Sequence, residues 1–244
     1  MKPTRDFAKE VDLRFEKKFF ISNKTAGEIE AYVKCNSAIF SEIYQQRRVN
    51  NIYFDSVSKN SFWQNIDGDP EKKKQRIRWY GCSEKKIDNP VLEYKIKKGM
   101  IGKKYSIAID PFNLSKDNWQ ESLSNSIFNS KLSNALIKDF DKLEPALLNY
   151  YDRKYFLSKD KRFRLTLDTN MTYLMPSRSG QKFLWKRADM QNMVLELKYS
   201  VEDDIDARAI YQQFPYRISK HSKYVVGVSL ISSIRNLIFN EFRI

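Results

Sequence analysis

The stretch QRIRWYG, residues 75–81, alternates charged and apolar side chains in the manner of a β-strand. Because successive side chains of a strand point to opposite faces of its sheet, Arg76 and Arg78 share one face. Ile77 and Trp79 share the other. A strand with one face in water shows the same alternation. The stretch therefore leaves two interpretations open, in which the arginines face either bulk water or an enclosed anionic ligand.

The alternation recurs along the chain. Four further segments carry a charged pair at positions i and i+2 with apolar residues beside it: Glu16 and Lys18, Glu93 and Lys95, Arg162 and Arg164, Glu196 and Lys198. Five such segments predict a sheet with one charged and one apolar face. Either an open sheet shows the charged face to water, or the sheet closes into a barrel with that face inside and no exposed edge.

Strands dominate the predicted secondary structure. Eight are expected at residues 13–21, 49–56, 75–81, 89–98, 104–110, 149–158, 163–174 and 193–200. A helix is expected to begin near Thr25, since Thr25 and Glu28 have the spacing of a capping box. Others are expected within 115–141, near 204–214 and over 223–241. No linker divides the chain, so we expect one α+β domain over residues 1–244 with a largely antiparallel sheet.

The composition points to a polyanionic partner. The 44 Lys and Arg residues outweigh 30 Asp and Glu, which gives a net charge of +14. The run Glu71–Lys74 follows the turn-like DGDP and is expected to be a solvated loop. No signal peptide or membrane span is predicted, so a cytoplasmic location is expected. Cys35 and Cys82 are expected to be buried thiols in a reducing compartment.

Carboxylates interspersed with the basic residues suggest a metal. An enclosed basic face would suit a linear polyanion, but its carboxylates would not help to bind an anion alone. Mg²⁺ and Mn²⁺ prefer carboxylate and phosphate oxygens as ligands. If the charged face is enclosed, its carboxylates are explained by a divalent cation that accompanies the anion.

Eight segments also resemble a known family. In chain order they are RFEKKF, IYFDS, RIRWYG, VLEYKIKKG, YYDRKYF, FRLTLDT, VLELKYS and SKHSKY. They resemble the polyphosphate-polymerase (VTC) domain of the vacuolar transporter chaperone family, which belongs to the triphosphate tunnel metalloenzymes. The resemblance runs from about Arg14 to Tyr224. It implies an antiparallel eight-stranded β-tunnel, a closed barrel with a charged lumen and flanking helices.

The resemblance also implies roles for individual residues. Phosphate binding would fall to Lys18, Arg76, Arg78, Lys95, Arg153, Arg164, Lys198, Lys220 and Lys223. Glu196 would bind Mn²⁺ or Mg²⁺ and would act in catalysis with Arg76, Arg78, Arg164 and Lys220. Glu16 departs from the ExE metal pair of the wider superfamily, because Lys18 occupies the third position. This departure argues against a plain triphosphatase.

The implied activity is a metal-dependent transfer of the γ-phosphate of ATP onto a growing inorganic polyphosphate chain. The acceptor phosphate is already a nucleophile, so no general base is required, and the single histidine, His221, is expected to be a bystander. Two alternatives stay open: a triphosphatase or tripolyphosphatase on the same tunnel, and a non-catalytic binder of polyphosphate or nucleic acid. A nucleic-acid partner is not expected. Association with a membrane partner and the oligomeric state are left open.

Overall fold

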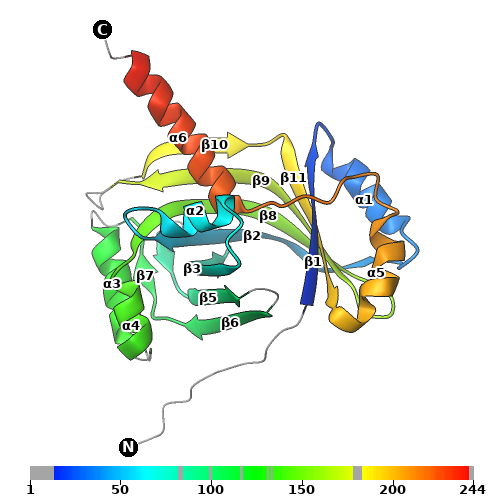
Figure 1. Cartoon of the computed structure of the whole chain (residues 1–244), viewed down its shortest axis with the longest axis horizontal. Coiled ribbons are helices and arrows are strands. Elements are labelled where there is room, and N and C mark those ends of the chain that lie inside the picture. The colour runs from blue at the N-terminus through cyan, green and yellow to red at the C-terminus, as the bar shows by residue number, and fades with distance from the viewer. Residues whose placement is uncertain are drawn as a thin grey trace, which may run out of the picture.

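The computed structural model describes residues 14–81, 85–98, 101–115, 118–130, 132, 134–177 and 183–241. Its centre is a strongly curled sheet of nine strands (Figure 1). Eight strands follow the order β1-β11-β9-β8-β2-β3-β5-β6, and β10 pairs with β9. The bounds are β1 (Arg14–Ser22), β2 (Ser41–Asp55), β3 (Glu71–Tyr80), β5 (Val91–Lys98), β6 (Ile101–Ala108), β8 (Glu144–Leu157), β9 (Arg164–Pro176), β10 (Phe183–Asp189) and β11 (Asn192–Ser200).

All pairings in this sheet are antiparallel, which confirms the predicted α+β class. A separate small pair consists of β4 (Lys86–Ile87) and β7 (Phe112–Asn113). Each of the eight expected strands is present, whereas β10 was not expected. The loop expected at Glu71–Lys74 was wrong. These residues form the first part of β3 and pair with β5 in the register Lys74 to Lys95.

The expected closure into a barrel is not observed. The strand path ends at β1 and β6, and these two edges do not pair within the described residues. A segment that follows α5 covers the free edge of β1 instead. The backbone N–H of Ser219 donates to the Lys18 carbonyl at 2.8 Å, and the N–H of Phe20 donates to the Ser219 hydroxyl at 3.0 Å. Because this segment takes up hydrogen bonds that a partner strand would use, the sheet is curled but open.

Helices cover the outer, apolar side of the sheet. Thr25 and Glu28 form the expected capping box at the start of the first helix. Ile77 and Trp79 are buried on the outer side against α3, as the alternation of QRIRWYG predicted. The helices are α1 (Ala26–Lys34), α2 (Asn60–Ile66), α3 (Trp119–Asn129), α4 (Asn134–Phe140), α5 (Asp204–Tyr211) and α6 (Lys223–Glu241), with a 3₁₀ turn, η1 (Val201–Asp203).

Two helices, α2 and α6, pack on the inner side of the curl at one end (Figure 1). The buried carboxylate of Asp55 holds both of them. It accepts hydrogen bonds from the backbone N–H groups of Ser61 and Phe62 and, at 2.5 Å, from the Tyr224 hydroxyl. Gly227 allows close approach, since a Cβ there would lie 2.5 Å from the Tyr173 ring. These contacts place the start of α6 beside the charged part of the inner face.

The remaining expectations concern the membrane and the cysteines. In the part of the chain that the structure describes, no helix is long and apolar enough to cross a membrane. Cys35 is a free thiol, but it is exposed at the end of α1, so the expectation of a buried side chain was wrong. Cys82 lies outside the described residues.

Candidate functional site

Four of the five charged i,i+2 pairs lie on the concave side of the sheet, which we call the inner face; the pair of Arg162 and Arg164 does not. Evidence that the four pairs converge comes from strands far apart in the strand order. The charge of Lys18 on β1 acts on the pKa values of both Lys74 on β3 and Lys95 on β5. Those strands lie near the opposite end of the path. The curl therefore brings charged side chains from both ends of the sheet close enough to influence one another.

The first cluster on the inner face joins β1 and β11. Glu196 is buried, with one carboxylate oxygen 2.6 Å from the Lys198 ammonium and the other 3.7 Å from that of Lys18. Lys18 also contacts Glu16 at 2.5 Å. Burial alone would raise the pKa of Glu196, but the charges of Lys198 and Lys18 outweigh burial and hold it well below its usual value. Glu196 is therefore ionised at neutral pH.

The second cluster joins β3 and β5. Arg76 donates its Nε–H to Glu93 at 2.6 Å, and Lys104 donates to the other Glu93 oxygen at 2.7 Å. Arg78 donates to the Asn51 side chain at 2.8 Å and to the Tyr151 hydroxyl at 3.3 Å. Burial would raise the pKa of Glu93, yet the neighbouring cations lower it. Arg76 and Arg78 thus face inward, as the alternation of their strand allowed.

The third cluster centres on Asp168, a residue that the sequence interpretation missed. Its fully buried carboxylate accepts two hydrogen bonds from Arg153, at 2.5 and 2.7 Å, and one from Lys223 at 2.5 Å. Both cations lie over the Tyr151 ring, at 5.2 and 4.6 Å from its centroid. Burial raises the pKa of Asp168, but Arg153 and Lys223 outweigh it and lower the value to about 2. The sequence did carry a signal for it: Asp168 lies four residues after Arg164 on the same strand, so the two side chains share the charged face.

Other predicted residues lie at the margins of the inner face. Arg164 pairs in register with Lys198, which places it on the inner side of β9. Lys95, Arg164 and Lys220 are exposed, and their side chains form no hydrogen bond or ion pair with the described residues. Arg162 does not belong to the set. It precedes β9 and pairs with Asp203 and Asp206, so the expected same-face pair of Arg162 and Arg164 was wrong.

The carboxylates of the first cluster suit a divalent cation that arrives with phosphate. The described residues contain no group of three or more His, Cys, Asp or Glu side chains that could hold a metal alone. Mg²⁺ is commonly bound by one or two carboxylates together with substrate phosphates. Glu196 and Glu16 contact the same Lys18 ammonium and offer only oxygen donors. Their chemistry fits Mg²⁺ or Mn²⁺, with phosphate oxygens as the remaining ligands.

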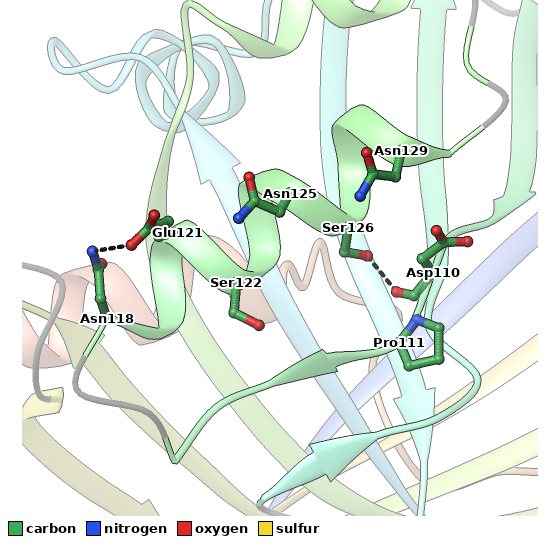
Figure 2. A pocket seen from close by; sticks show the side chains of 8 residues that line it. All are labelled: Asp110, Pro111, Asn118, Glu121, Ser122, Asn125, Ser126 and Asn129. Atoms are coloured by element: carbon green, nitrogen blue, oxygen red, sulfur yellow. Dashed lines mark hydrogen bonds between the residues drawn. The ribbon is translucent and has the colours of Figure 1, made fainter.

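A cavity of about 590 Å³ lies elsewhere, on the flank of α3 (Figure 2). It has two carboxylates and several amides and hydroxyls in its lining but no lysine or arginine. Figure 2 shows the Ser126 hydroxyl donating to the Asp110 carbonyl across it. Such a lining repels polyanions, so the inner face is the better candidate site. The lining residues are Asp110, Pro111, Asn118, Glu121, Ser122, Asn125, Ser126 and Asn129.

A curled antiparallel sheet with a cation-rich inner face defines the fold class of the triphosphate tunnel proteins. Within this class, the chain belongs to the VTC domain family, whose family model matches residues 13–232. The family places the chain among polyphosphate-related tunnel enzymes of the phosphoryl-transfer type.

Two solved structures are similar to this chain, and the first of them agrees with this fold. A candidate adenylate cyclase from Vibrio parahaemolyticus is 14% identical, with a TM-score of 0.50 over 89% of this chain and 99% of that one. A candidate adenylyl cyclase from Hippeastrum, described as having a dominant triphosphatase activity, is 13% identical with a TM-score of 0.47 over 88% and 96%. No curated protein sequence matches the chain. At such identities the first likeness shows the fold alone.

Proposed function

We propose that this chain is a polyphosphate polymerase. It transfers the γ-phosphate of ATP onto the terminal phosphate of an inorganic polyphosphate chain at the inner face, with Mn²⁺ or Mg²⁺. The observation that carries the proposal is that four carboxylates of the inner face each contact a lysine or arginine: Glu16, Glu93, Asp168 and Glu196. The inner face therefore combines many phosphate-binding groups with carboxylates that are poor proton acceptors.

The state of these carboxylates favours phosphate over water as the acceptor. A general base works best when its pKa lies near the working pH. The pKa values of Glu93, Asp168 and Glu196 are all lowered. For His221, burial and the charges of Lys223 and Lys18 lower the pKa to about 4, so it is also a weak base. Water must lose a proton on attack, whereas an ionised terminal phosphate need not.

The paired cations can still bind phosphate. A guanidinium group has five N–H donors, and Arg153 uses only its Nε and Nη2 groups on Asp168. The two-fold pairing fixes the plane of the group, and the other donors can meet a phosphate without reorientation. Arg76 is held differently: its Nε and Nη2 groups contact one oxygen of Glu93, and its Nη1 group donates to the Tyr53 hydroxyl at 3.4 Å. Fixed donors of this kind stabilise charge that develops on a transferring phosphoryl group.

Each predicted site residue has a role in this proposal. Glu196 holds the metal, which neutralises charge on the phosphate oxygens when it is bound. Arg164 and Lys220, without a carboxylate partner among the described residues, act with Arg76 and Arg78 on the reacting phosphates. The remaining cations hold the substrate: Lys18, Lys95, Arg153, Lys198 and Lys223. The assignment of residues 1–244 to one domain is part of the same proposal.

The test is incubation of the full chain with ATP and Mn²⁺ or Mg²⁺, with and without a short polyphosphate primer. Gel electrophoresis is expected to show long phosphate chains. Release of orthophosphate without chain growth would replace the polymerase by a triphosphatase. Metal-independent binding of polyphosphate without turnover would make the chain a non-catalytic binder.

A further inference from the structure

One stripe of β3 carries four cations on the inner face: Lys72, Lys74, Arg76 and Arg78. Alternate residues of a strand lie about 7 Å apart, so the stripe is about 20 Å long. That length exceeds the three linked phosphoryl groups of a nucleoside triphosphate. Lys73 points to the opposite side, where its ammonium lies 3.9 Å from Asp139 of α4.

The two ends of the stripe differ in charge compensation. Arg76 and Arg78 contact Glu93, Asn51 and Tyr151. Lys72 and Lys74 form no side-chain hydrogen bond or ion pair with any described residue. Lys95, the register partner of Lys74, has no such partner there either.

The groups that face Lys74 are cationic on each neighbouring strand. They are Lys18 of β1, Lys95 of β5, and Lys72 and Arg76 of β3. Burial and then these four charges lower the pKa of Lys74 to about 7. Lysines are held together in this way at a cost in free energy, which an anion bound among them would remove. Lys72 and Lys74 form no ion pair with a described carboxylate, whereas the charges of Glu16 and Glu196 act on Lys95 without forming an ion pair with it.

We propose that Lys72, Lys74 and Lys95 form a further anion subsite, which binds phosphoryl units of a polyphosphate chain beyond those at Arg76 and Arg78. The inference rests on the proposed function for the identity of the ligand. Its ligand is a linear condensed phosphate longer than triphosphate, since only such a chain can reach both ends of the stripe. The subsite makes affinity depend on chain length.

The matched variants are Lys74→Gln and Lys73→Gln, which remove one charge from the inner and the outer side of the same strand. Calorimetric titration of the full chain uses tripolyphosphate and a long inorganic polyphosphate of defined length. Loss of one charge-assisted contact is expected to weaken long-chain binding by Lys74→Gln about tenfold. Tripolyphosphate binding is expected to change less than about twofold, and Lys73→Gln to leave both ligands unaffected.

Lys74→Arg supplies a second readout. Lys74 is protonated below a pH of about 7 and neutral above it, so long-chain affinity of the wild type is expected to fall between roughly pH 6 and 8. Arginine stays charged over that range, so Lys74→Arg should bind with a flatter pH profile. Thermal unfolding should show no loss of stability in Lys74→Gln, because the substitution relieves like-charge repulsion.

Equal long-chain affinities of Lys74→Gln and Lys73→Gln would overturn the subsite, as would equal losses for the short and the long ligand. These outcomes are separable from the fate of the proposed function. A wild-type protein that makes no polymer from ATP, but whose Lys74→Gln variant loses only long-chain binding, would keep the subsite and reject the polymerase. Normal polymer synthesis by the wild type, with identical long-chain binding by Lys74→Gln and Lys73→Gln, would keep the polymerase and reject the subsite.

Discussion

Two clusters on the inner face differ in how their positive charge is compensated. They are Arg153–Asp168–Lys223 and Lys72–Lys74–Lys95. In the first, a fully buried carboxylate contacts both cations at hydrogen-bonding distance. In the second, Lys72 and Lys74 form no ion pair with a described carboxylate and the charges that act on Lys74 are cationic, while Glu16 and Glu196 act on Lys95 without forming an ion pair with it. The difference indicates two uses of charge on one sheet. We propose that the first, compensated cluster stabilises the fold and orients donors, whereas the second lowers stability until an anion binds.

The largest expected effect is on stability, and it comes from removing the Asp168 carboxylate. Asp168→Asn leaves two buried cations without a countercharge and is expected to lower the free energy of unfolding by about 3–5 kcal/mol. Chemical denaturation measures the change. The matched control is Asp152→Asn on β8, whose partly buried carboxylate lies 3.5 Å from Arg48 and accepts a hydrogen bond from Asn170, and whose loss should cost about 1 kcal/mol. Similar stabilities of the two variants would contradict the role given to Asp168.

The next largest effect is expected on activity. Glu196→Gln removes the carboxylate that we assign to the metal and should lower kcat/KM of ATP-dependent synthesis by about 100-fold or more. The measurement is initial rate across a Mn²⁺ titration. Glu202→Gln, on the exposed η1 turn, is the charge-matched control. A Glu196→Gln enzyme with unchanged metal dependence would remove Glu196 from the metal site.

The compensated cluster also predicts a response to acid. The pKa of Asp168 falls from 3.8 to about 2 on folding, so its contribution is fully present above about pH 4 and is lost as pH falls toward 2. The contribution at neutral pH is about 2 kcal/mol. Urea denaturation at several pH values should show this decline in the wild type and a shallower one in Asp168→Asn. Parallel pH profiles for both proteins would contradict the assignment.

The smallest expected effect distinguishes two neighbouring arginines, one outside the inner face and one on it. Arg162 and Arg164 are two residues apart, but only Arg164 lies on the inner face. Arg162→Ala removes exposed ion pairs and should cost less than about 1 kcal/mol without loss of activity. Arg164→Ala should weaken polyphosphate synthesis about tenfold at unchanged stability. A larger activity loss in Arg162→Ala than in Arg164→Ala would reverse the assigned faces.

The alternation of charge predicted much of the inner face from sequence. The i,i+2 pairs Arg76–Arg78 and Glu196–Lys198 carry their orientation locally, because a strand fixes which side chains share a face. The capping box at Thr25 is local in the same way. Lys72 and Lys74 were missed because the preceding DGDP turn and a run of lysines have the composition of a solvated loop. Only the pairing of β3 with β5 makes them inner-face residues.

Features that depend on distant segments could not be predicted. Asp168 meets Lys223 across 55 residues, and no local pattern indicates that contact. The closure expected from the family resemblance failed for a similar reason. The edge of β1 is taken by the Ser219 segment, which is 199 residues from Phe20. Competition between a strand and a returning loop for one edge is decided by tertiary packing.

The measurement closest to the central claim is a crystal structure of the full chain with a non-hydrolysable ATP analogue and Mn²⁺. The triphosphate is expected on the inner face in contact with Arg76, Arg78 and Arg153, with Mn²⁺ bound between its oxygens and Glu196. A triphosphate on the outer side of the sheet, or in the cavity beside α3, would contradict the assignment of the inner face as the phosphate-transfer site.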